Sequence, residues 1–375
     1  MEMTVLQRPP ANRIVHVLVT VPVGEGGQGG IDRIMASLKH ELERRGPGDI
    51  RPRFLATRGR GHIALSLLHT FAFCFRMLGA RLRGKVDVVH INLASHGSTY
   101  RKLFISGWAA MLGIPYVLHL HGGGYKRFWP EADTLLSRRI GAMFRKAAGV
   151  IVLGKIWRDF VLSKVPEAEG RVVILPNATE TPSLPHKGGG DKVQILFLGR
   201  IEKDKGTPEL CEALGLMADL PGWRATIAGA GEEEMLRARL KQLGLEGRVA
   251  VPGWQTARDV ARLLSEADIL TLPSFVENQP ISIIEGMAAG LAVVATPVGA
   301  VEDIVSDGET GFLVPPGDVP ALKNALSRLV EEPELRRRMG EAGKARHRAC
   351  LDVAPFADAL CDIWRAAAES RVEQR

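Results

Sequence analysis

Two glutamates, Glu277 and Glu285, stand eight positions apart around a predicted change from strand to helix. Residues 268–272 (DILTL) form an apolar run of strand length, and the proline and serine that follow end it. Pro280 has no N–H and a φ preset near the helical value, so we expect it at the first helical position. Glu277 then lies on the loop before the helix, and Glu285 lies in the second turn of the helix.

The start of this predicted helix offers backbone amides without intrahelical partners. An unpaired helix N-terminus at the end of a strand is an anion site, and phosphate suits it well. Carboxylates beside such a site do not hold the phosphate, but they accept hydrogen bonds from neutral hydroxyls of a ribose or a hexose. A phosphate flanked by polyols is a nucleotide sugar, so the segment predicts a nucleotide-sugar site. The amides concerned are those of Gln279, Ile281 and Ser282.

Further blocks stand in a fixed order around the two glutamates. The apolar strand at 193–198 (VQILFL) is followed by Gly199-Arg200 and, after four intervening residues, by Lys205-Gly206. Together with Glu277-x7-Glu285, the blocks resemble the retaining glycosyltransferases of family 4, which have the GT-B fold. The resemblance is dense over about residues 172–345 and scattered in the N-terminal half. The remaining blocks are Ile174-Leu175-Pro176-Asn177, Thr296-Pro297-Val298-Gly299 and Gly311-Phe312-Leu313-Val314.

The resemblance implies a role for each matching residue. Arg200 and Lys205 are expected to clamp the donor diphosphate, and Glu277 is expected to accept hydrogen bonds from the transferred sugar. His121 matches the position where a histidine of the family faces the transferred sugar across the cleft. The expected catalytic residues are Arg200, Lys205, Glu277 and His121. The expected donor-binding residues are Gly29, Gly30, Gly199, Arg200, Lys205, Asn278, Gln279, Pro280, Ile281 and, for the ribose, Glu285. The expected acceptor-side residues are His90, Asn92, Arg101, Lys102 and Gly122.

Two departures from the family pattern limit this transfer of roles. The Gly-Phe-Gly that follows the first glutamate in the family is replaced by Asn278-Gln279-Pro280. The family's Gly-Gly-x-Pro-Glu is replaced by residues 299–303 (GAVED), which end in a shorter acid. The choice between UDP and GDP, the transferred sugar, the acceptor and its linkage, and the oligomeric state therefore stay open.

Apolar runs alternate with helical patterns along the chain, which is typical of α/β proteins with doubly wound parallel sheets. We expect a first Rossmann-like domain at 1–182, a linker rich in proline and glycine at 181–190, and a nucleotide-sugar-binding Rossmann-like domain at 191–352. In the GT-B fold two such domains face a central cleft, and the helical pattern at 353–375 is expected to pack back on the first. The strand-like runs lie at 13–21, 53–57, 86–92, 116–122, 149–154, 172–177, 193–199, 224–229, 249–253, 268–272, 292–296 and 311–314.

A glycine-rich loop after the first strand supports a rival class. Gly24, Gly26 and Gly29 form a G-x-G-x-x-G, the fingerprint of dinucleotide binding, so an NAD(P)-dependent oxidoreductase is one alternative. The acid expected after the second strand is absent from residues 51–61 (RPRFLATRGRG). The family resemblance instead implies that Gly29-Gly30 lets the backbone approach the donor phosphate and the acceptor. The other alternative is a catalytically inactive nucleotide-sugar-binding protein of the same fold.

Metal ligands and cofactor motifs are not recognisable in the sequence. His119 and His121 alternate along one strand without a third ligand at metal spacing, and we expect His119 to be structural. No Asp-x-Asp triplet is present, so the two cations after 193–198 are expected to replace a metal at the diphosphate, with no other cofactor. The four cysteines form no metal or disulfide pattern and fit a reducing cytosol.

The charge is unevenly distributed along the chain. Residues 1–186 carry 26 lysines and arginines against 13 acidic residues, whereas the remainder carries 23 against 29. No nucleic-acid motif accompanies the arginines, so we expect an anionic membrane surface, not nucleic acid, as the partner. Residues 61–83 are rich in leucine and phenylalanine and flanked by arginine, a composition that favours a helix at a membrane interface. His69 and Arg76, which interrupt the apolar side of this segment, argue against a bilayer span.

These observations lead to one expected function and location. Residues 90–102 (HINLASHGSTYRK) look like bacterial enzymes of surface-polysaccharide assembly. We expect a cytoplasmic enzyme, peripheral on the inner face of the cytoplasmic membrane, because no apolar signal segment precedes the first strand. It would move a hexosyl group from a nucleotide-diphosphate sugar to a hydroxyl of a lipid-linked saccharide or an oligosaccharide, with retention of configuration.

Overall fold

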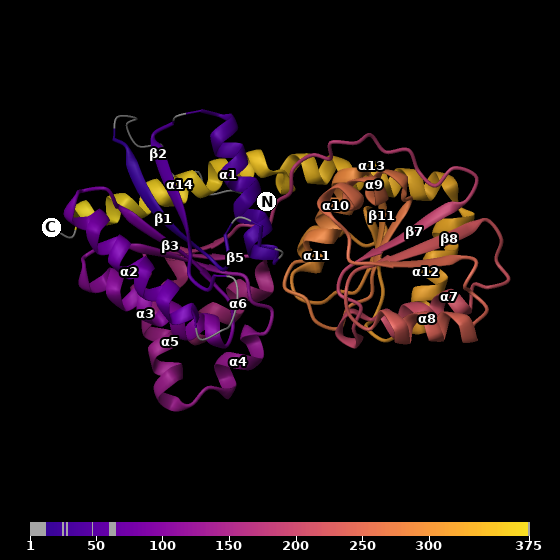
Figure 1. The fold of residues 1–375 in the computed structure, drawn as a ribbon, viewed down its shortest axis with the longest axis horizontal. Helices are drawn as coiled ribbons and strands as arrows, with labels where there is room; N and C mark the ends of the chain where they lie inside the picture. Colours follow the sequence, from indigo (N-terminus) through magenta and orange to yellow (C-terminus); the bar gives the residue numbers. More distant parts are fainter. Residues whose placement is uncertain (1–12, 25, 28, 47, 60–64, 374–375) are drawn as a thin grey trace. The chain divides into compact units, whose positions relative to one another are not determined.

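The computed structural model describes residues 13–24, 26–27, 29–46, 48–59 and 65–373. The chain divides into two compact units. The first comprises residues 1–175 together with 353–375, and the second comprises residues 176–352. Figure 1 shows the helix at 353–373 in yellow, lying along the indigo and magenta elements of the first unit.

The first unit is built on a six-stranded parallel sheet in the order β2-β1-β3-β4-β5-β6. Its four central strands are rich in valine, isoleucine and leucine and almost entirely buried, as expected where helices cover both faces of a parallel sheet. The strands are β1 (Val15–Val21), β2 (Ile50–Ala56), β3 (Val88–Leu93), β4 (Tyr116–Leu120), β5 (Gly149–Val152) and β6 (Val172–Ile174).

The helices of the first unit follow the strands in alternation, and the last of them comes from the end of the chain. Apolar residues of each helix at helical spacing pack on the sheet, as in Ile34, Met35 and Leu38 of α1. The helices are α1 (Gly30–Arg44), α2 (Ser66–Leu82), α3 (Gly97–Met111), α4 (Tyr125–Glu131), α5 (Thr134–Lys146), α6 (Lys155–Lys164), η2 (Pro166–Arg171) and α14 (Val353–Glu373).

The second unit has another six-stranded parallel sheet, in the order β12-β11-β10-β7-β8-β9. Its strands are β7 (Val193–Leu198), β8 (Trp223–Ala228), β9 (Val249–Gly253), β10 (Ile269–Leu272), β11 (Ala292–Ala295) and β12 (Gly311–Leu313). The chain order reverses between β7 and β10, and ligands of open α/β sheets bind at such a switch point, beyond the carboxyl ends of the strands. The doubly wound arrangement predicted from the sequence is therefore present in both units.

The helices of the second unit enclose one continuous apolar core. Its largest fully buried side chains include Trp223 and Phe197, which come from neighbouring strands of the sheet. The helices are η3 (Lys203–Lys205), α7 (Thr207–Gly215), α8 (Glu233–Gln242), α9 (Ala257–Glu266), α10 (Ile281–Ala289), α11 (Val301–Ile304), α12 (Val319–Glu331), α13 (Pro333–Arg346) and the π-helical turn η4 (His347–Leu351).

The division between the units falls at Leu175–Pro176, earlier than the linker expected at 181–190. Residues of that segment are hydrogen-bonded within the second unit, where the Lys187 amide donates to the Ser265 carbonyl over 2.7 Å. The Asp268 carboxylate accepts the amides of Gly189 (2.9 Å) and Gln194 (2.8 Å). These hydrogen bonds fix a segment whose composition resembles a linker to the second unit.

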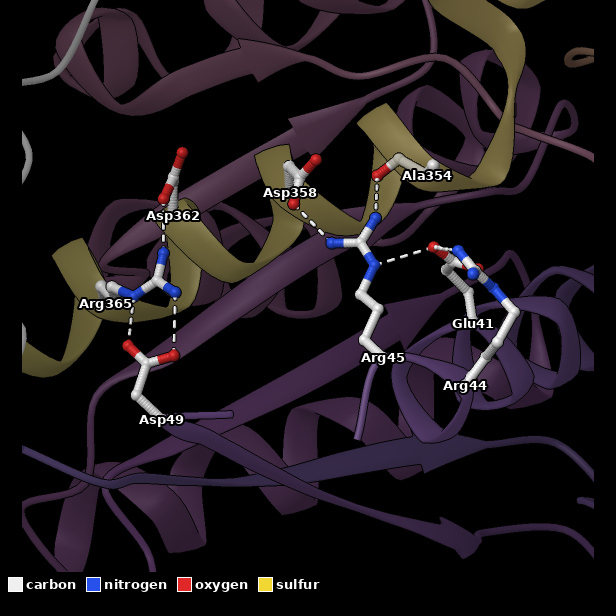
Figure 2. Close-up of polar contacts among 8 residues, drawn as sticks. All are labelled: Glu41, Arg44, Arg45, Asp49, Ala354, Asp358, Asp362 and Arg365. Atoms are coloured by element: carbon white, nitrogen blue, oxygen red, sulfur yellow. Dashed lines mark hydrogen bonds and ion pairs between the residues drawn. The ribbon is translucent and has the colours of Figure 1, made fainter. Parts of the chain in front are cut away.

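Helix α14 belongs to the first unit through both apolar and charged contacts. Its inward side buries Phe356, Leu360 and Trp364. Figure 2 shows its polar side, where Arg365 makes two hydrogen bonds to the Asp49 carboxylate (2.7 and 3.0 Å). On the same helix, Asp358 accepts a hydrogen bond from Arg45 at 2.5 Å, and the Ala354 carbonyl accepts another from the same guanidinium. Within the described part of the chain, no helix is both long and apolar enough to cross a membrane.

Candidate active site

The loop after β7 brings the first cation to the switch point of the second sheet. Gly199 and Ile201 are fixed by hydrogen bonds from their amides to the carbonyls of Ala228 (3.1 Å) and Ala230 (2.9 Å). Arg200 stands between them with 73% of its side chain exposed, and its guanidinium pairs with Glu202 at 2.7 Å. Because a solvent-exposed ion pair is weak, this guanidinium is available to an incoming anion.

Lys205 and Glu277 form an ion pair at the same edge of the sheet. The Lys205 Nζ donates to Glu277 Oε1 over 2.6 Å, and Ser274 Oγ donates to the same oxygen over 2.9 Å. Both side chains are mostly buried, with 20% and 9% exposed. The sequence motifs assigned Lys205 to the diphosphate and Glu277 to the sugar, and they gave no sign that the two side chains meet.

Two glycines let the surrounding loops approach closely enough to make this pair. Gly206 has φ 69°, and a Cβ there would clash with the carbonyl oxygen of Pro273, at the end of β10. Gly299 has φ 62°, and a Cβ there would clash with the backbone oxygens of Glu277 and Asn278. Only glycine combines a positive φ with such close packing, so both positions shape the site.

Helix α10 starts one residue later than the sequence predicts. Pro280 is the N-cap, with φ −73° and ψ 125°, and the first helical residue is Ile281. The expectation of Pro280 at the first helical position is thus wrong by one residue, because its extended ψ keeps it outside the helix. It supplies no side-chain cap, so the N-terminus of α10 opens onto the loop that carries Glu277. Glu285 lies within α10, half-buried.

The two amide side chains between Glu277 and α10 behave differently. Gln279 is 4% exposed, and its side-chain oxygen accepts the amide of Asn177 at 2.5 Å. The Asn177 side chain donates in turn to the Gln279 carbonyl over 3.0 Å. Asn278 has both side-chain polar atoms buried without a hydrogen-bond partner among the described residues. Gln279 therefore holds the segment that enters the second unit, whereas Asn278 has unused hydrogen-bonding capacity.

The glycine-rich loop after β1 is arranged around a carboxylate that the sequence analysis missed. Asp32, in the first turn of α1, accepts the backbone amides of Val23 (3.0 Å) and Gly24 (2.9 Å). Gly29 is the N-cap of α1 and Gly30 is its first residue; both are exposed. Amides that already hold a carboxylate are not available to a pyrophosphate, which argues against the dinucleotide interpretation. The sequence signal that could have identified Asp32 is an acidic residue in the first helical turn after a glycine-rich loop.

Three histidines and an asparagine cluster at the carboxyl ends of β3 and β4. The Asn92 side-chain oxygen lies 3.2 Å from His90 Nε2 and 2.8 Å from His121 Nε2. His119 is fully buried, and neither of its ring nitrogens has a hydrogen-bond partner among the described residues. Its ring centroid lies 3.9 Å from that of His121, which is only half-buried. His121 is therefore the ring of this pair that remains partly accessible.

Burial keeps these imidazoles uncharged. The pKa of His90 is lowered to about 4, mainly by desolvation; Lys102 also lowers it, whereas the hydrogen bond to Asn92 raises it. Desolvation also lowers the pKa of His121 to about 3, with a smaller contribution from His90. The pKa of His119 is lowered well below its usual value for the same reason. The cluster thus presents neutral rings at physiological pH.

The other expected acceptor-side residues lie on α3 and on the loop after β4. Lys102 is 3% exposed, and its Nζ donates to Thr57 Oγ1 over 2.7 Å. Burial and the neighbouring Arg101 hold the pKa of Lys102 well below its usual value. Gly122 packs closely against the loop after β3. A Cβ on Gly122 would come within 3.0 Å of the backbone atoms of Ala94 and Ser95 in that loop.

The expected site residues thus form two groups that belong to different units. His90, Asn92 and His121 lie together in the first unit. The group of the second unit comprises Gly199, Arg200, Lys205, Glu277, Asn278, Gln279, Pro280, Ile281 and Glu285, at the carboxyl ends of β7 and β10 and the start of α10. Within the described ranges, no three or more His, Cys, Asp or Glu side chains, including the three clustered histidines, are arranged so that they could hold a metal ion.

Comparison with known families matches both halves of the chain. The family described as "Glycosyl transferase 4-like domain" matches residues 11–178, and the family described as "Glycosyl transferases group 1" matches residues 184–346. The alpha-D-kanosaminyltransferase of Streptomyces kanamyceticus is 28% identical over 314 residues, which span 77% of this chain and 78% of that protein.

Two further relatives extend the comparison. The phosphatidyl-myo-inositol mannosyltransferase of Mycobacterium leprae is 35% identical over 179 residues, or 46% of this chain and 47% of that protein. Anabaena HepE, solved in complex with UDP, superposes with a TM-score of 0.72 at 18% identity over 93% of this chain and 99% of that one. The fold is GT-B, as the resemblance implied.

Proposed function

Because the chain belongs to the family 4 glycosyltransferases of the GT-B fold, we propose that it moves a hexosyl group from a nucleotide-diphosphate sugar to a hydroxyl, with retention of configuration. The observation that carries the proposal is the group at the switch point of the second sheet. There Arg200, Lys205 and the open N-terminus of α10 offer positive charge around the carboxylate of Glu277. The complex of HepE with UDP supports a nucleotide donor.

The second-unit cations act on the leaving group. As the bond between the anomeric carbon and the phosphate oxygen breaks, its electron pair moves onto the diphosphate and the sugar becomes oxocarbenium-like. Arg200 and Lys205 then stabilise charge that develops only in the transition state, which is where electrostatics accelerates a reaction. In this proposal they take the place of a metal ion at the diphosphate.

The acceptor hydroxyl attacks the anomeric carbon on the face that the diphosphate leaves. Its proton passes to the departing phosphate oxygen, so the products are the glycoside and the nucleoside diphosphate. No carboxylate is required as a nucleophile, unlike in retaining hydrolases. Glu277 fixes the sugar through its hydroxyls, Glu285 binds the ribose diol, and His121 contacts the transferred sugar.

In this proposal the ion pair between Lys205 and Glu277 links binding of the diphosphate to binding of the sugar. Without ligand, each charge neutralises the other in a mostly buried position. A diphosphate that reaches Lys205 competes with Glu277 and releases the carboxylate to hydroxyl groups. Binding of the nucleotide would thereby prepare the sugar contact.

Two alternatives were open on the sequence alone. Family membership and the carboxylate of Asp32 in the glycine-rich loop remove the support for an oxidoreductase. A binding protein without activity lacks turnover, which a coupled assay of nucleotide release detects. We first expect UDP- or GDP-sugars to raise the melting temperature in a thermal-shift screen, because a ligand of the native state stabilises by mass action. If no nucleotide sugar stabilises the protein or is turned over, the proposed function is wrong.

We further propose that the acceptor is linked to a lipid and that the first unit docks on the inner face of an anionic membrane. Helix α2 exposes Leu67, Leu68, Phe71, Phe75 and Leu82, with Phe75 70% exposed. Phe71 meets Phe104 of α3 edge to face, with ring centroids 5.4 Å apart, so the apolar surface continues onto α3. The mannosyltransferase relative, whose name contains a phosphatidyl lipid, supports a lipid acceptor.

A groove of about 880 Å³ between α3 and α5 continues this surface. Phe104, Met111 and Leu135 line it, and the cations Arg139 and Lys146 line it too. Apolar side chains flanked by cations suit the interface of an anionic bilayer, where each cation contributes about 1 kcal/mol. A cytoplasmic enzyme in exopolysaccharide or cell-surface assembly would meet its acceptor there.

Vesicle sedimentation tests the membrane proposal. We expect binding to anionic vesicles that weakens as salt rises, since the attraction is screened over roughly 8 Å at physiological ionic strength. Phe75→Ser should weaken binding, whereas Met235→Ser, at an apolar residue of the second unit that is 59% exposed, should not. Equal binding to anionic and neutral vesicles, or none at low salt, would point to a soluble acceptor.

A further inference from the structure

A chain of hydrogen bonds runs from the C-terminal helix to His121. On α14, Trp364 is fully buried, and its indole N–H donates to His90 Nδ1 over 3.1 Å. An indole nitrogen only donates, so His90 Nδ1 is the acceptor and the His90 proton is on Nε2. That proton points at the side-chain oxygen of Asn92, 3.2 Å away.

The orientation of the Asn92 amide is fixed by β1. Its NH2 group donates to the carbonyl of Thr20 over 2.7 Å, and its backbone amide donates to Thr20 Oγ1 over 2.9 Å. The side-chain oxygen must therefore face the two histidines, where it accepts from both rings. His121 Nε2, 2.8 Å from that oxygen, carries the proton, and His121 Nδ1 keeps its lone pair. Among the described residues, none donates a hydrogen bond to this nitrogen.

We propose that Asn92 and Trp364 are positioning residues that hold His121 in the tautomer whose Nδ1 accepts a hydrogen bond from a hydroxyl of the transferred sugar. This inference rests on the proposed function for the identity of the ligand. The arrangement of the rings is a property of the unliganded protein and can be tested without any substrate.

The surroundings of His121 preserve the neutral state that this role requires. The titratable groups near it are His119, in ring contact, and His90, and the cation that acts on His90 is Lys102 of α3. No carboxylate hydrogen-bonds to these four groups among the described residues. Burial lowers the pKa of His121 to about 3. A neutral ring in one tautomer offers one acceptor to a hydroxyl and has no charge to attract a phosphate.

Ion pairs hold α14 in the orientation about its own axis that the hydrogen-bond network requires. Arg365, the residue after Trp364, makes its two hydrogen bonds with Asp49, and Asp358 pairs with Arg45 further up the helix (Figure 2). These ion pairs lie on the outer side of α14, whereas Trp364 points into the unit. The last helix of the chain thus contributes the first donor of the network.

Nitrogen-15 NMR of the histidine rings tests the network directly. In the unliganded protein we expect His90 and His121 both to be neutral with the proton on Nε2 at pH 7. Trp364→Phe should remove the hydrogen bond to His90 Nδ1 and shift the nitrogen-15 resonance of that nitrogen, while the Asn92 oxygen keeps the proton on Nε2. The matched control is Trp157→Phe, because Trp157 is equally buried and its indole N–H has no partner among the described residues. A His121 ring with its proton on Nδ1 in the native protein would overturn the proposal.

Kinetics then tests the consequence for the sugar. Trp364→Phe should lower kcat/KM about fivefold, the effect of one buried neutral hydrogen bond. Asn92→Asp places a carboxylate between the two rings and raises their pKa values. The variant should therefore lose activity about tenfold as the pH falls from 8 to 6, while native kcat/KM shows no such step. Asn324→Asp, which adds the same charge on exposed α12, is the control.

The outcomes separate the two claims. Parallel pH profiles of the native protein and a folded Asn92→Asp variant would reject the role of Asn92. If that variant does not fold, the nitrogen-15 shift of His90 Nδ1 in Trp364→Phe still decides whether the network exists. Correct tautomers without turnover of any nucleotide sugar would reject the proposed function and leave the network standing.

Discussion

At the carboxyl edge of the first sheet the clustered polar side chains are uncharged imidazoles and an amide, all buried except the half-buried His121. The same edge of the second sheet carries an arginine exposed to solvent and a mostly buried ion pair of lysine and glutamate. His90 and His121 have pKa values lowered to about 4 and about 3, so the first group carries no charge at physiological pH. In our proposal the charge of the diphosphate is stabilised by the second unit alone, whereas the first unit contributes a neutral ring to the recognition of sugar hydroxyls.

The largest effect on activity is expected for the two cations that stabilise the charge of the departing diphosphate. Lys205→Ala and Arg200→Ala should each lower kcat by a factor of ~100 or more, as for loss of a transition-state donor. Lys203→Ala, an exposed lysine of the same short helix η3, should leave kcat unchanged. Steady-state kinetics at saturating donor measures these effects. A near-normal kcat in both site variants would show that the carboxyl edge of the second sheet does not stabilise the charge of the diphosphate.

Acid should destabilise the first unit through its neutral histidines. The folded-state pKa of His90 lies below the unfolded value of about 6.5, so the unfolded chain takes up the proton first as the pH falls. The free energy of unfolding should therefore decrease from pH 6.5 downwards, by about 3 kcal/mol for His90 once the pH is below 4. Hydrogen exchange of the β3 and β4 amides at pH 7 and pH 5 measures it. Exchange-derived free energies that do not change between these pH values would contradict the neutral state of the cluster.

The two glutamates of the second unit should separate in their effects on nucleotide binding. Glu285→Gln should weaken the bare nucleoside diphosphate about tenfold, because the ribose loses a charged acceptor. Glu277→Gln should leave that affinity unchanged or improve it, since Lys205 is freed from its partner, and should impair sugar transfer. Calorimetry with the bare nucleotide makes the comparison. Equal losses in both variants would refute the division between ribose and sugar.

The smallest effect is expected at the outer side of α14. Asp358 is 68% exposed, so Asp358→Ala should change the free energy of unfolding by only about 0.5 kcal/mol. Asp49→Ala should cost slightly more, because Arg365 loses two hydrogen bonds at a less exposed position. Urea denaturation of both variants provides the numbers. A loss above about 2 kcal/mol for Asp358→Ala would show that α14 depends on its charged contacts more than on its apolar ones.

The sequence predicts the fold well because its buried strands are recognisable as apolar runs. Val293 and Val294 of β11, like the other central strand residues, are buried on both faces, and an uninterrupted apolar run results. The pair of Lys205 and Glu277 was not predictable in the same way. These residues are 72 positions apart, and they meet only because β7 lies next to β10 in the sheet.

The first-unit network shows the same limit more strongly. Trp364 and His90 are 274 positions apart, and nothing local to either residue indicates the other. Asp32 is the opposite case, because its partners Val23 and Gly24 lie within nine positions in the same strand–loop–helix segment. Motif matching predicts which residues take part in the chemistry. Which of these residues contact one another depends on the order of the strands in the sheet. That order cannot be inferred from residue spacing along the chain.

The placement of α14 in the first unit has a consequence for how the protein is made. A ribosome completes residues 176–352 before it adds the helix that buries Phe356, Leu360 and Trp364 in the first unit. The second unit can therefore finish folding while the earlier-synthesised one still has an open apolar surface and an imidazole lacking its indole donor. We therefore expect the second unit to finish folding first, and a released chain truncated after residue 352 should show a protected second unit and a protease-sensitive first one.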